Sequence, residues 1–512
     1  MPANLDEQAI RSVVEQVMKQ IGQTNGAPTR NDARPAQPVP GPGNPHPTPG
    51  APAGISADVS QPAGCCCHDS HGVYAEAEKA IEGAQAAYEL LCRKGVEARK
   101  QVVAIIKRLA EENAGAWGRI ELEETKIGRL DHKVEKLQIV KLVPGVEWLR
   151  PDARSGDHGI TLEEYTPFGV IGAITPSTHS VPTLSGNIVN AVAAGNSLVF
   201  NPHPGAARCA AVAVRAYNQA IEREVGIRNL VTTIEKPTLE SFDAICKDER
   251  VRLLCITGGP AVVQAALKSG KRAICAGPGN PPVVIDETAD LDKAARDIIQ
   301  GAGYDNNLLC IGEKEVFVVA EVADAFIAAL NKHGAAQLNS SQLAALTEAA
   351  FTYKEGEGVG CGHPVLKRDL VGKDASVLAK ACGASVPADC PLLFAETDAD
   401  HAFVVEEQMM PMLPVVRVPD FKTAVAEAKK AEHGYKHSAM IHSRNVEAMT
   451  YMARELEPTL FVKNGPCVAG LGLGGEGYLS YSVATTTGEG ITTPQTFTRT
   501  RRCVMVDNLK IY

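Results

Sequence analysis

The chain has 512 residues and a formal net charge of -9, with 45% apolar and 22% charged residues. This length allows two or three domains with substantial cores, and the composition is that of a globular protein. The negative charge argues against a basic surface for nucleic acid or an anionic membrane. No apolar run approaches the roughly 20 residues of a membrane span, and no secretory signal is recognisable. The 14 scattered cysteines indicate a reducing cytoplasm rather than a disulfide framework.

Residues 1–21 are predicted to form an amphipathic helix. Apolar residues recur every three to four positions, at Leu5, Ile10, Val14, Met18 and Ile21. Residues 22–73 are rich in Pro, Gly and Ala and predict a disordered linker. A short helix cannot bury its apolar face against itself, so a helix on a long tether favours a docking device. The alternative is a helix that caps the surface of its own chain.

Cys65, Cys66, Cys67 and His68 stand together at the end of this linker. Thiolates and imidazole suit zinc, but three adjacent cysteines do not easily converge on one tetrahedral ion. An oxidation-prone linker end is the favoured interpretation, and no metal site is predicted.

From about residue 74 the sequence alternates between helix and strand signals. Two helices are predicted over Ala75–Leu109, and further helices over Trp117–Leu142. Buried strands and helices then alternate, with strands at 169–174, 197–200, 231–234 and 252–256. A second series of strands and helices runs from residue 282 to about 462. Such alternation implies right-handed crossovers and parallel, doubly wound sheets, which is an α/β fold.

Three of the predicted strands end in small or polar residues. These ends are Thr175-Pro176-Ser177-Thr178, Asn201-Pro202 and Thr257-Gly258-Gly259. Doubly wound sheets bind ligands at the carboxyl ends of their strands, and a turn before a helix offers unpaired N–H groups. Neither a GxGxxG nor a Walker motif is present. These strand ends are therefore equally consistent with a nucleotide-binding site and with loops that merely close the sheet.

Cys310 lies between a helix-like stretch and the predicted strand at residues 315–319. A thiol at such a junction could be exposed and polarised by helix amides, which favour the thiolate. A lone cysteine is nevertheless more often a buried structural residue.

Six segments occur in an order that is typical of one enzyme family. They are Ile174-Thr-Pro-Ser-Thr178, Thr257-Gly-Gly259, Gly277-Pro-Gly-Asn-Pro-Pro282, Asp305-Asn-Asn-Leu-Leu-Cys310, Glu406-Glu-Gln-Met-Met-Pro411 and Leu473-Gly-Gly-Glu-Gly-Tyr478. Together they resemble the aldehyde dehydrogenase superfamily, and within it the CoA-acylating propionaldehyde and acetaldehyde dehydrogenases of bacterial microcompartments. The resemblance covers roughly Tyr74 to the C-terminus.

The resemblance assigns roles to individual residues. Cys310 matches the nucleophile that carries a thioester, and its backbone N–H would donate to the oxyanion. Thr178 stands where hydrolytic relatives usually carry an oxyanion-stabilising Asn. His179 and His437 are each either a base for a thiol or a polar loop residue. The implied NAD contacts are Thr175, Pro176, Ser177, Asn201, Thr257, Gly258, Gly259, Gly277 and Glu407.

The segment Cys275–Gly279 departs from the hydrolytic members of the family. They carry a water-activating Glu there, whereas this chain has no carboxylate. We therefore expect that water does not hydrolyse the thioester and that coenzyme A takes the acyl group, forming acyl-CoA. A hydrolytic aldehyde dehydrogenase and a catalytically silent scaffold are the alternatives. Acetaldehyde and propionaldehyde both remain open as substrates, and so does NADP beside NAD.

The resemblance also implies the domain organisation. The NAD-binding domain is expected at residues 74–278, with an arm segment at 157–167, and the catalytic domain at 279–470. Residues 471–512 would form a return segment and a strand-rich oligomerisation arm from Thr485 to Val506, in a homodimer or homotetramer. Residues 1–21 resemble encapsulation peptides, which implies shell or cargo proteins as partners and a place in the cytoplasm inside a microcompartment.

Overall fold

The computed structural model describes residues 71–354 and 363–509. The predicted N-terminal helix, its linker and Cys65–Cys67 lie outside the described residues. Among the helices of the described ranges, none is both long and apolar enough to cross a membrane.

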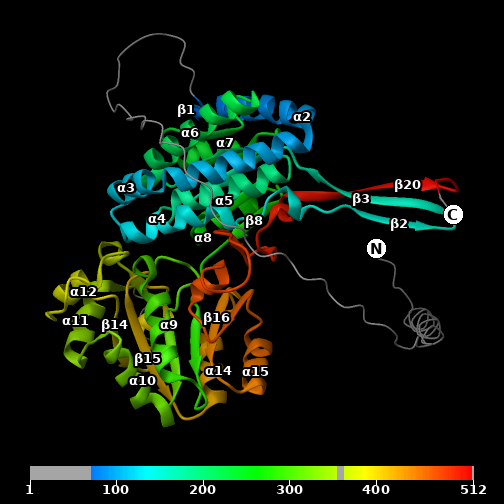
Figure 1. Cartoon of the computed structure of the whole chain (residues 1–512). Coiled ribbons are helices and arrows are strands. Elements are labelled where there is room, and N and C mark those ends of the chain that lie inside the picture. The colour runs from blue at the N-terminus through cyan, green and yellow to red at the C-terminus, as the bar shows by residue number, and fades with distance from the viewer. Residues whose placement is uncertain (1–70, 355–362, 510–512) are drawn as a thin grey trace, which may run out of the picture. The chain divides into compact units, whose positions relative to one another are not determined.

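A six-stranded, all-parallel sheet forms the first layer of the fold (Figure 1). Its order is β1-β6-β5-β4-β7-β8. The strands are β1 (Val73–Tyr74), β4 (Val170–Ile174), β5 (Ser197–Phe200), β6 (Val231–Ile234), β7 (Val251–Thr257) and β8 (Ala273–Ala276). The chain leaves β4 first toward β5 and β6, and later returns to its other side with β7 and β8. The gap between the carboxyl ends of β4 and β7 is therefore the topological switch point at which such sheets bind ligands.

Helices cover both faces of this sheet, which confirms the predicted doubly wound α/β fold. They are α2 (Ala77–Glu112), α3 (Ala114–Thr125), α4 (Leu130–Gln138), α5 (Ser180–Ala193), α6 (Ala207–Val225), α7 (Leu239–Lys247) and α8 (Pro260–Lys268). The two helices expected over Ala75–Leu109 are the two halves of α2. Gly95, with φ 77°, interrupts the helical backbone between them.

A second parallel sheet of seven strands has the order β11-β14-β15-β10-β9-β16-β17. Its strands are β9 (Pro282–Ile285), β10 (Glu315–Val319), β11 (Ala336–Gln337), β14 (Leu393–Thr397), β15 (Met412–Val418), β16 (Ser438–His442) and β17 (Leu460–Lys463). The helices around it are α9 (Leu291–Gly303), α10 (Ala320–Lys332), α11 (Ser340–Ala350), α12 (Ala375–Ala381), α13 (Ala402–Val405), α14 (Phe421–Ala431) and α15 (Val446–Leu456). The largest cluster of buried apolar side chains contains residues of both sheets, so they share one core.

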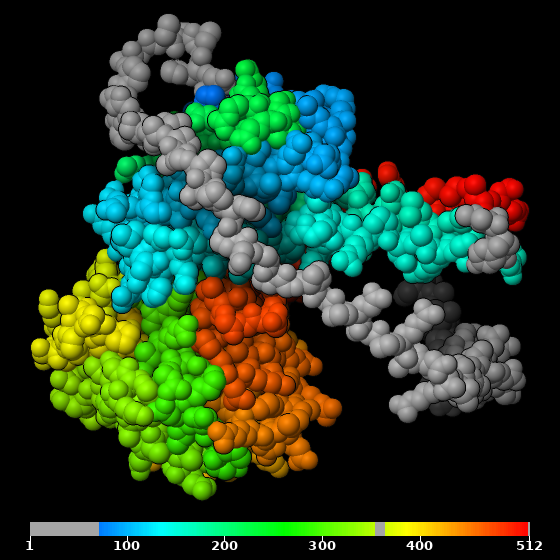
Figure 2. All heavy atoms as spheres, in the orientation of Figure 1, coloured from blue at the N-terminus to red at the C-terminus, as the bar shows by residue number. Residues whose placement is uncertain are grey.

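Three long antiparallel strands, β2 (Asp152–Gly156), β3 (Gly159–Pro167) and β20 (Thr498–Val506), form an arm. Figure 2 shows it extending away from the helices, with the C-terminal strand in red on the cyan hairpin. Within the predicted strand-rich segment Thr485–Val506, the structure has the short strand β19 (Gly490–Ile491) and the long strand β20, with a 3-10 helix between them. Gly488, with φ 85°, lies in the turn that precedes β19.

Short elements complete the described chain. They are the hairpins β12 (Phe351–Lys354) with β13 (His363–Leu366) and β18 (Val483–Ala484) with β19 (Gly490–Ile491), and the 3-10 helices η1 (Ile139–Leu142), η2 (Val146–Trp148), η3 (Pro204–Ala206), η4 (Tyr304–Asn307), η5 (Arg368–Leu370), η6 (Cys467–Leu471) and η7 (Pro494–Phe497).

Candidate active site

A cavity of about 700 Å³ opens at the carboxyl ends of the first sheet. Its walls include eight of the residues singled out from the sequence: Thr175, Pro176, Ser177, Thr178, Asn201, Thr257, Gly258 and Gly259. Apolar side chains of α7 and α8, Phe242 and Val262, add to the lining. Both the volume and the mixture of apolar walls with polar strand ends suit a nucleotide.

The polar groups at these strand ends are partly engaged by the protein. Asn201 accepts a hydrogen bond from the Ser241 hydroxyl at 2.6 Å, and its amide donates to the Thr238 carbonyl at 3.2 Å. The Gly258 N–H, expected to be unpaired, donates to the Ala276 carbonyl at 3.3 Å. The turn before α8 therefore offers a ligand fewer donors than the sequence suggests.

The loop before the candidate nucleophile adopts an unusual backbone conformation. Asp305, Asn306 and Asn307 have φ of 47°, 55° and 63°, all in the left-handed region. Asp and Asn tolerate this region best, but each such residue still stores strain of about 1 kcal/mol or more. Hydrogen bonds hold the run in place. The Asn306 amide donates to the Gly372 carbonyl at 2.9 Å, and the Asn307 amide donates to the Glu313 carbonyl at 2.8 Å.

Cys310 follows this loop in the turn before β10 and is half-buried. Burial, followed by the Glu407 carboxylate, raises the pKa of its thiol to about 12. Lys314, the backbone N–H of Cys310 and Lys136 act in the opposite direction. The expected helix amides do not assist, because α9 ends at Gly303 and Cys310 therefore follows the negative end of that helix. Formation of the thiolate depends on the two lysines and on the backbone N–H instead.

Glu407 enters the same buried space from the turn after α13. Burial raises the pKa of its carboxyl group, while the Lys314 ammonium and the Gly279 N–H lower it. Met409, two residues further on, has φ 47° and lines the cavity. The turn thus links the charged surroundings of Cys310, through Glu407, to the cavity at the strand ends, through Met409.

His437 stands beside Cys310 with one ring nitrogen free. A Cβ on Gly279 would lie 2.8 Å from the Cys310 carbonyl and 2.9 Å from the His437 ring, so only a glycine fits between them. Nδ1 of His437 is 2.8 Å from the Ser438 hydroxyl, whereas Nε2 is buried without a hydrogen-bond partner among the described residues. Burial, reinforced by Lys314, lowers the imidazole pKa to about 4. The ring is therefore neutral at pH 7 and able to accept a proton.

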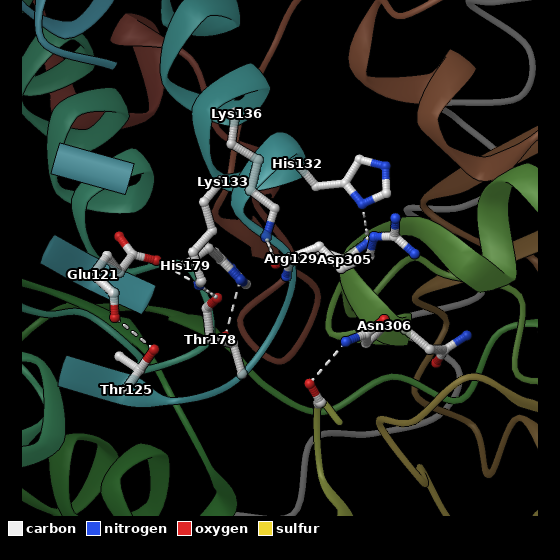
Figure 3. Close-up of polar contacts among 12 residues, drawn as sticks. Glu121, Thr125, Arg129, His132, Lys133, Lys136, Thr178, His179, Asp305 and Asn306 are labelled. Carbon is white, nitrogen blue, oxygen red and sulfur yellow. Dashed lines mark hydrogen bonds and ion pairs between the residues drawn. The ribbon is translucent and has the colours of Figure 1, made fainter. Parts of the chain in front are cut away.

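Thr178 and His179 contact each other rather than the thiol. The Thr178 hydroxyl is 2.9 Å from Nδ1 of His179, and the Thr178 carbonyl accepts from Lys133 at 3.3 Å (Figure 3). His179 is buried, and burial followed by Lys136 and Lys133 lowers its pKa well below the ordinary value. The arrangement suits a positioning turn better than a proton-transfer group.

The segment Cys275–Gly279 is covered by the C-terminal return segment. The Thr487 hydroxyl accepts from the Cys275 N–H at 2.9 Å. A Cβ on Gly277 would lie 2.6 Å from the Thr486 hydroxyl, so a glycine is needed here for the close approach of the return segment. Cys275 itself is buried in β8. No carboxylate lies within the segment itself. Burial, followed by the Glu489 carboxylate of the return segment, which the Thr487 hydroxyl contacts, raises the pKa of the Cys275 thiol to about 11.

The structure separates the predicted site residues into two groups. Eight line the cavity, while Cys310, Glu407, Gly277 and the buried His179 are not part of its lining. Sequence reasoning missed Lys136 and Lys314, the two ammonium groups that influence the thiol. Both side chains are buried, and their sequence context resembles that of solvated lysines. The one available signal was Lys314 itself, four residues after the nucleophile.

The fold has two doubly wound parallel sheets, and a nucleotide-sized cavity opens at the strand ends of the first. A half-buried thiol stands in the loop before β10. This combination is typical of a nucleotide-dependent enzyme with a cysteine nucleophile. The chain belongs to the aldehyde dehydrogenase family, whose model, described as "Aldehyde dehydrogenase family", matches residues 57–475. The resemblance inferred from the six motifs is confirmed.

Acylating enzymes are among the relatives. An acetaldehyde dehydrogenase (acetylating) of Escherichia coli is 43% identical over 86% of this chain and 93% of its own length. A crystal structure of Rhodopseudomonas palustris propionaldehyde dehydrogenase with bound CoA and an acylated cysteine is 42% identical, with TM-score 0.83, and covers 86% of this chain and 100% of that one. A propionaldehyde dehydrogenase from the Clostridium phytofermentans fucose utilisation microcompartment is 41% identical, with the same TM-score and coverage.

Proposed function

We propose that this chain is a CoA-acylating aldehyde dehydrogenase. It converts a short aliphatic aldehyde, propionaldehyde or acetaldehyde, with NAD⁺ and CoA to the acyl-CoA, NADH and a proton. The observation that carries the proposal is the pairing of a half-buried Cys310 with a segment Cys275–Gly279 that holds no carboxylate. The acylating activities of the relatives support it.

Cys310 performs the covalent chemistry. Its thiolate adds to the aldehyde carbon, and the carbonyl oxygen becomes an oxyanion that the Cys310 N–H can stabilise. NAD⁺ supplies the hydride acceptor, and loss of hydride from the thiohemiacetal leaves a thioester on the sulfur. Thr178 is a second candidate donor to the oxyanion, since its turn is fixed at the edge of the cavity.

The cavity at the strand ends is the proposed cofactor site. Thr175, Pro176, Ser177, Asn201 and the Thr257–Gly259 turn line it. Glu407, whose carboxylate acts on the Cys310 thiol, is the proposed contact to the nicotinamide ribose. Gly277 contributes by letting the return segment pack closely at the end of β8.

The thioester is then transferred to the thiol of CoA. His437 is the proposed proton acceptor, because its Nε2 is unpartnered among the described residues and its neighbour Gly279 also faces Cys310. His179 is the second candidate; Thr178 engages its Nδ1, as Ser438 engages that of His437. Thiol attack forms the new thioester and returns Cys310 as a free thiol, so the acyl group keeps its activation.

The decisive experiment measures NADH formation by the purified enzyme with and without CoA. We expect steady turnover only with CoA, and acyl-CoA rather than free acid as the product. Cys310→Ala should abolish turnover, whereas Cys92→Ala, which changes an exposed cysteine on α2, should not. Full turnover without CoA, with carboxylate as the product, would show a hydrolytic enzyme. Indifference to Cys310→Ala would point to a non-catalytic role.

The proposed setting is a bacterial microcompartment. One structural relative comes from such a compartment, and residues 1–21 have the pattern of a docking helix. The arm supports assembly into a homodimer or homotetramer, because its strand β20 exposes Val504 and Val506, at 56% and 62%, on a sheet edge. Size determination by light scattering of the full chain and of a chain ending at residue 497 tests the role of the arm.

A further inference from the structure

Four charged side chains beside the candidate active site are almost completely buried. Glu121, Lys133 and Lys136 are each 1% exposed, and Asp305 is fully buried. They form two ion pairs, Glu121 with Lys133 and Lys136 with Asp305. Burying such charges costs several kcal/mol per ion, which the pairing only partly offsets, so stability alone is a weak reason for them. Their positions point to a role in the site.

The first pair holds the turn at the edge of the cavity. Lys133 is 3.0 Å from Glu121, and its ammonium also donates to the Thr178 carbonyl at 3.3 Å. The second oxygen of Glu121 accepts from the Val181 N–H at 3.0 Å, in the first turn of α5. The pair therefore joins α3 and α4 to the segment that follows β4.

The second pair holds the start of the left-handed loop before Cys310. Asp305 pairs with Lys136 through one carboxylate oxygen and accepts from the Arg129 N–H at 2.7 Å through the other. The Asp305 N–H donates to Nδ1 of His132 at 2.9 Å. Both carboxylate oxygens and the backbone N–H of Asp305 are thus bound by residues of α4 or by Arg129, which directly precedes α4.

Lys133 and Lys136 stand three residues apart on α4 and reach different parts of the site (Figure 3). Lys133 contacts the turn that follows β4 of the first sheet. Lys136 contacts Asp305, in the loop that leads to Cys310 and the second sheet. We propose that α4 sets the spacing between these two halves of the active site, and that Lys136 is the positioning residue that holds the Cys310 loop and supplies a positive charge to the thiolate. This inference rests on the proposed nucleophilic role of Cys310.

The electrostatic surroundings agree with this role. The charged groups that act on the Cys310 thiol are Glu407, which raises its pKa, and Lys314 and Lys136, which lower it. Burial lowers the pKa of Lys136, while Asp305 and Glu121 raise it and Lys133 lowers it. Replacing Lys136 with a neutral residue would remove one of the two cations that act on the thiol, and it would leave the buried Asp305 without its ammonium partner. The loss of the cation disfavours the thiolate.

The test is the rate at which iodoacetamide alkylates Cys310 in the full-length enzyme without cofactor or aldehyde, followed by mass spectrometry of the Cys310 peptide. Below its pKa the thiol reacts in proportion to its thiolate fraction, so a rise of one pH unit in the pKa slows alkylation about tenfold. We expect alkylation of Cys310 in the Lys136→Met variant to be about tenfold slower than in wild type between pH 8 and 10. The Lys136→Arg variant should keep most of the wild-type alkylation rate. Lys141→Met, which removes an exposed partner of Glu111 just beyond α4, should match the wild type.

Asp305→Asn separates electrostatics from simple loosening. It removes the negative charge, so its alkylation rate should equal or exceed that of the wild type, opposite to Lys136→Met. If Lys136 only stabilised the fold, a loosened loop would expose the sulfur and speed alkylation in both variants, which would overturn the proposal. The Asp305→Asn comparison still stands if Lys136→Met does not fold, and slower alkylation in Asp305→Asn would then count against the inference. A wild-type enzyme that makes no acyl-CoA would refute the proposed function without altering these alkylation rates.

Discussion

The ring of His437 and the carbonyl of Cys310 both pack against the Cα of Gly279, on the side where any other residue would carry its Cβ. The space between them does not admit a methyl group, since its carbon would lie 2.8 Å from the carbonyl oxygen and 2.9 Å from the ring. This contact joins the end of β8 to the nucleophile loop and to the start of β16. It brings a candidate base close to the backbone of Cys310, although 127 positions separate the two residues in the chain.

Gly279→Ala tests whether this close approach matters for catalysis. We expect kcat to fall at least tenfold, because either the Cys310 backbone or the imidazole must move by several tenths of an ångström. Gly383→Ala is a suitable control for a general effect of the substitution. Gly383 has open space around its Cα, and because its φ of 72° favours glycine, the control will lose some stability as well. Wild-type kcat in Gly279→Ala would contradict a tight arrangement of the two groups.

His437→Gln should separate the two halves of the reaction. We expect one equivalent of NADH to form rapidly, followed by steady turnover that is about 10² to 10⁴ times slower, because the incoming thiol loses its proton acceptor. In wild type, the pH dependence of acyl transfer should follow the lowered pKa of His437, which is about 4. Transfer from a preformed acyl-enzyme should therefore stay fast as the pH falls through 6.5 and decline only near pH 4 to 5. Loss of the NADH burst in the variant would instead place His437 in the first half of the reaction.

The strands and the cavity residues could be predicted because they depend on local signals. Apolar runs such as Val170–Ile174 end at Pro or Gly, and parallel strands bring their ends together. The role of α4 could not be predicted in this way. Lys133 and Lys136 lie in a polar, helix-forming segment that resembles a solvated surface, and only packing against Glu121 and Asp305 buries them. The charges that act on the Cys310 thiol were missed for a similar reason, because Glu407 and Lys136 come from distant parts of the chain and the burial of Lys314 is not visible in the sequence.

Glu313→Gln should change how stability depends on pH. Burial raises the pKa of Glu313 to about 7, although its carboxylate accepts from the Cys467 N–H at 2.8 Å. A carboxyl group whose pKa is raised on folding stabilises the protein fully below its unfolded pKa near 4.5, and this contribution is lost as the pH rises through 7. The loss amounts to about 3 kcal/mol.

The variant keeps an oxygen acceptor but cannot ionise. Its Tm relative to wild type should therefore rise between pH 5 and pH 8, as measured by thermal unfolding. Glu97→Gln, at an exposed position on α2, serves as the matched control and should show no such trend. A Tm difference that stays constant with pH would show that Glu313 does not change its ionisation in this range.

Arg368 should contribute to binding of the phosphate-bearing co-substrates. Of the side chains that line the cavity within the described ranges, it is the only Lys or Arg. Charged hydrogen bonds to phosphate contribute about 1.5 kcal/mol or more, so Arg368→Ala should raise KM for NAD or CoA about tenfold with kcat nearly unchanged. The difference from wild type should shrink at high salt, which screens an exposed charge. Unchanged KM values for both co-substrates would exclude Arg368 from the binding site.

Deletion of residues 1–21 tests whether the terminal helix serves docking or the enzyme itself. A docking helix makes no contribution to the catalytic fold, so kcat, KM and Tm of the shortened enzyme should remain within about twofold, or a few degrees, of wild type. Co-purification with microcompartment shells should be lost. Replacing Ile10, Val14 and Met18 with Ser in the full chain removes the apolar face while keeping the length, and it should have the same effect. If the deletion lowers Tm or activity, the apolar face packs on the enzyme; if shells still retain the shortened chain, another surface makes the contact.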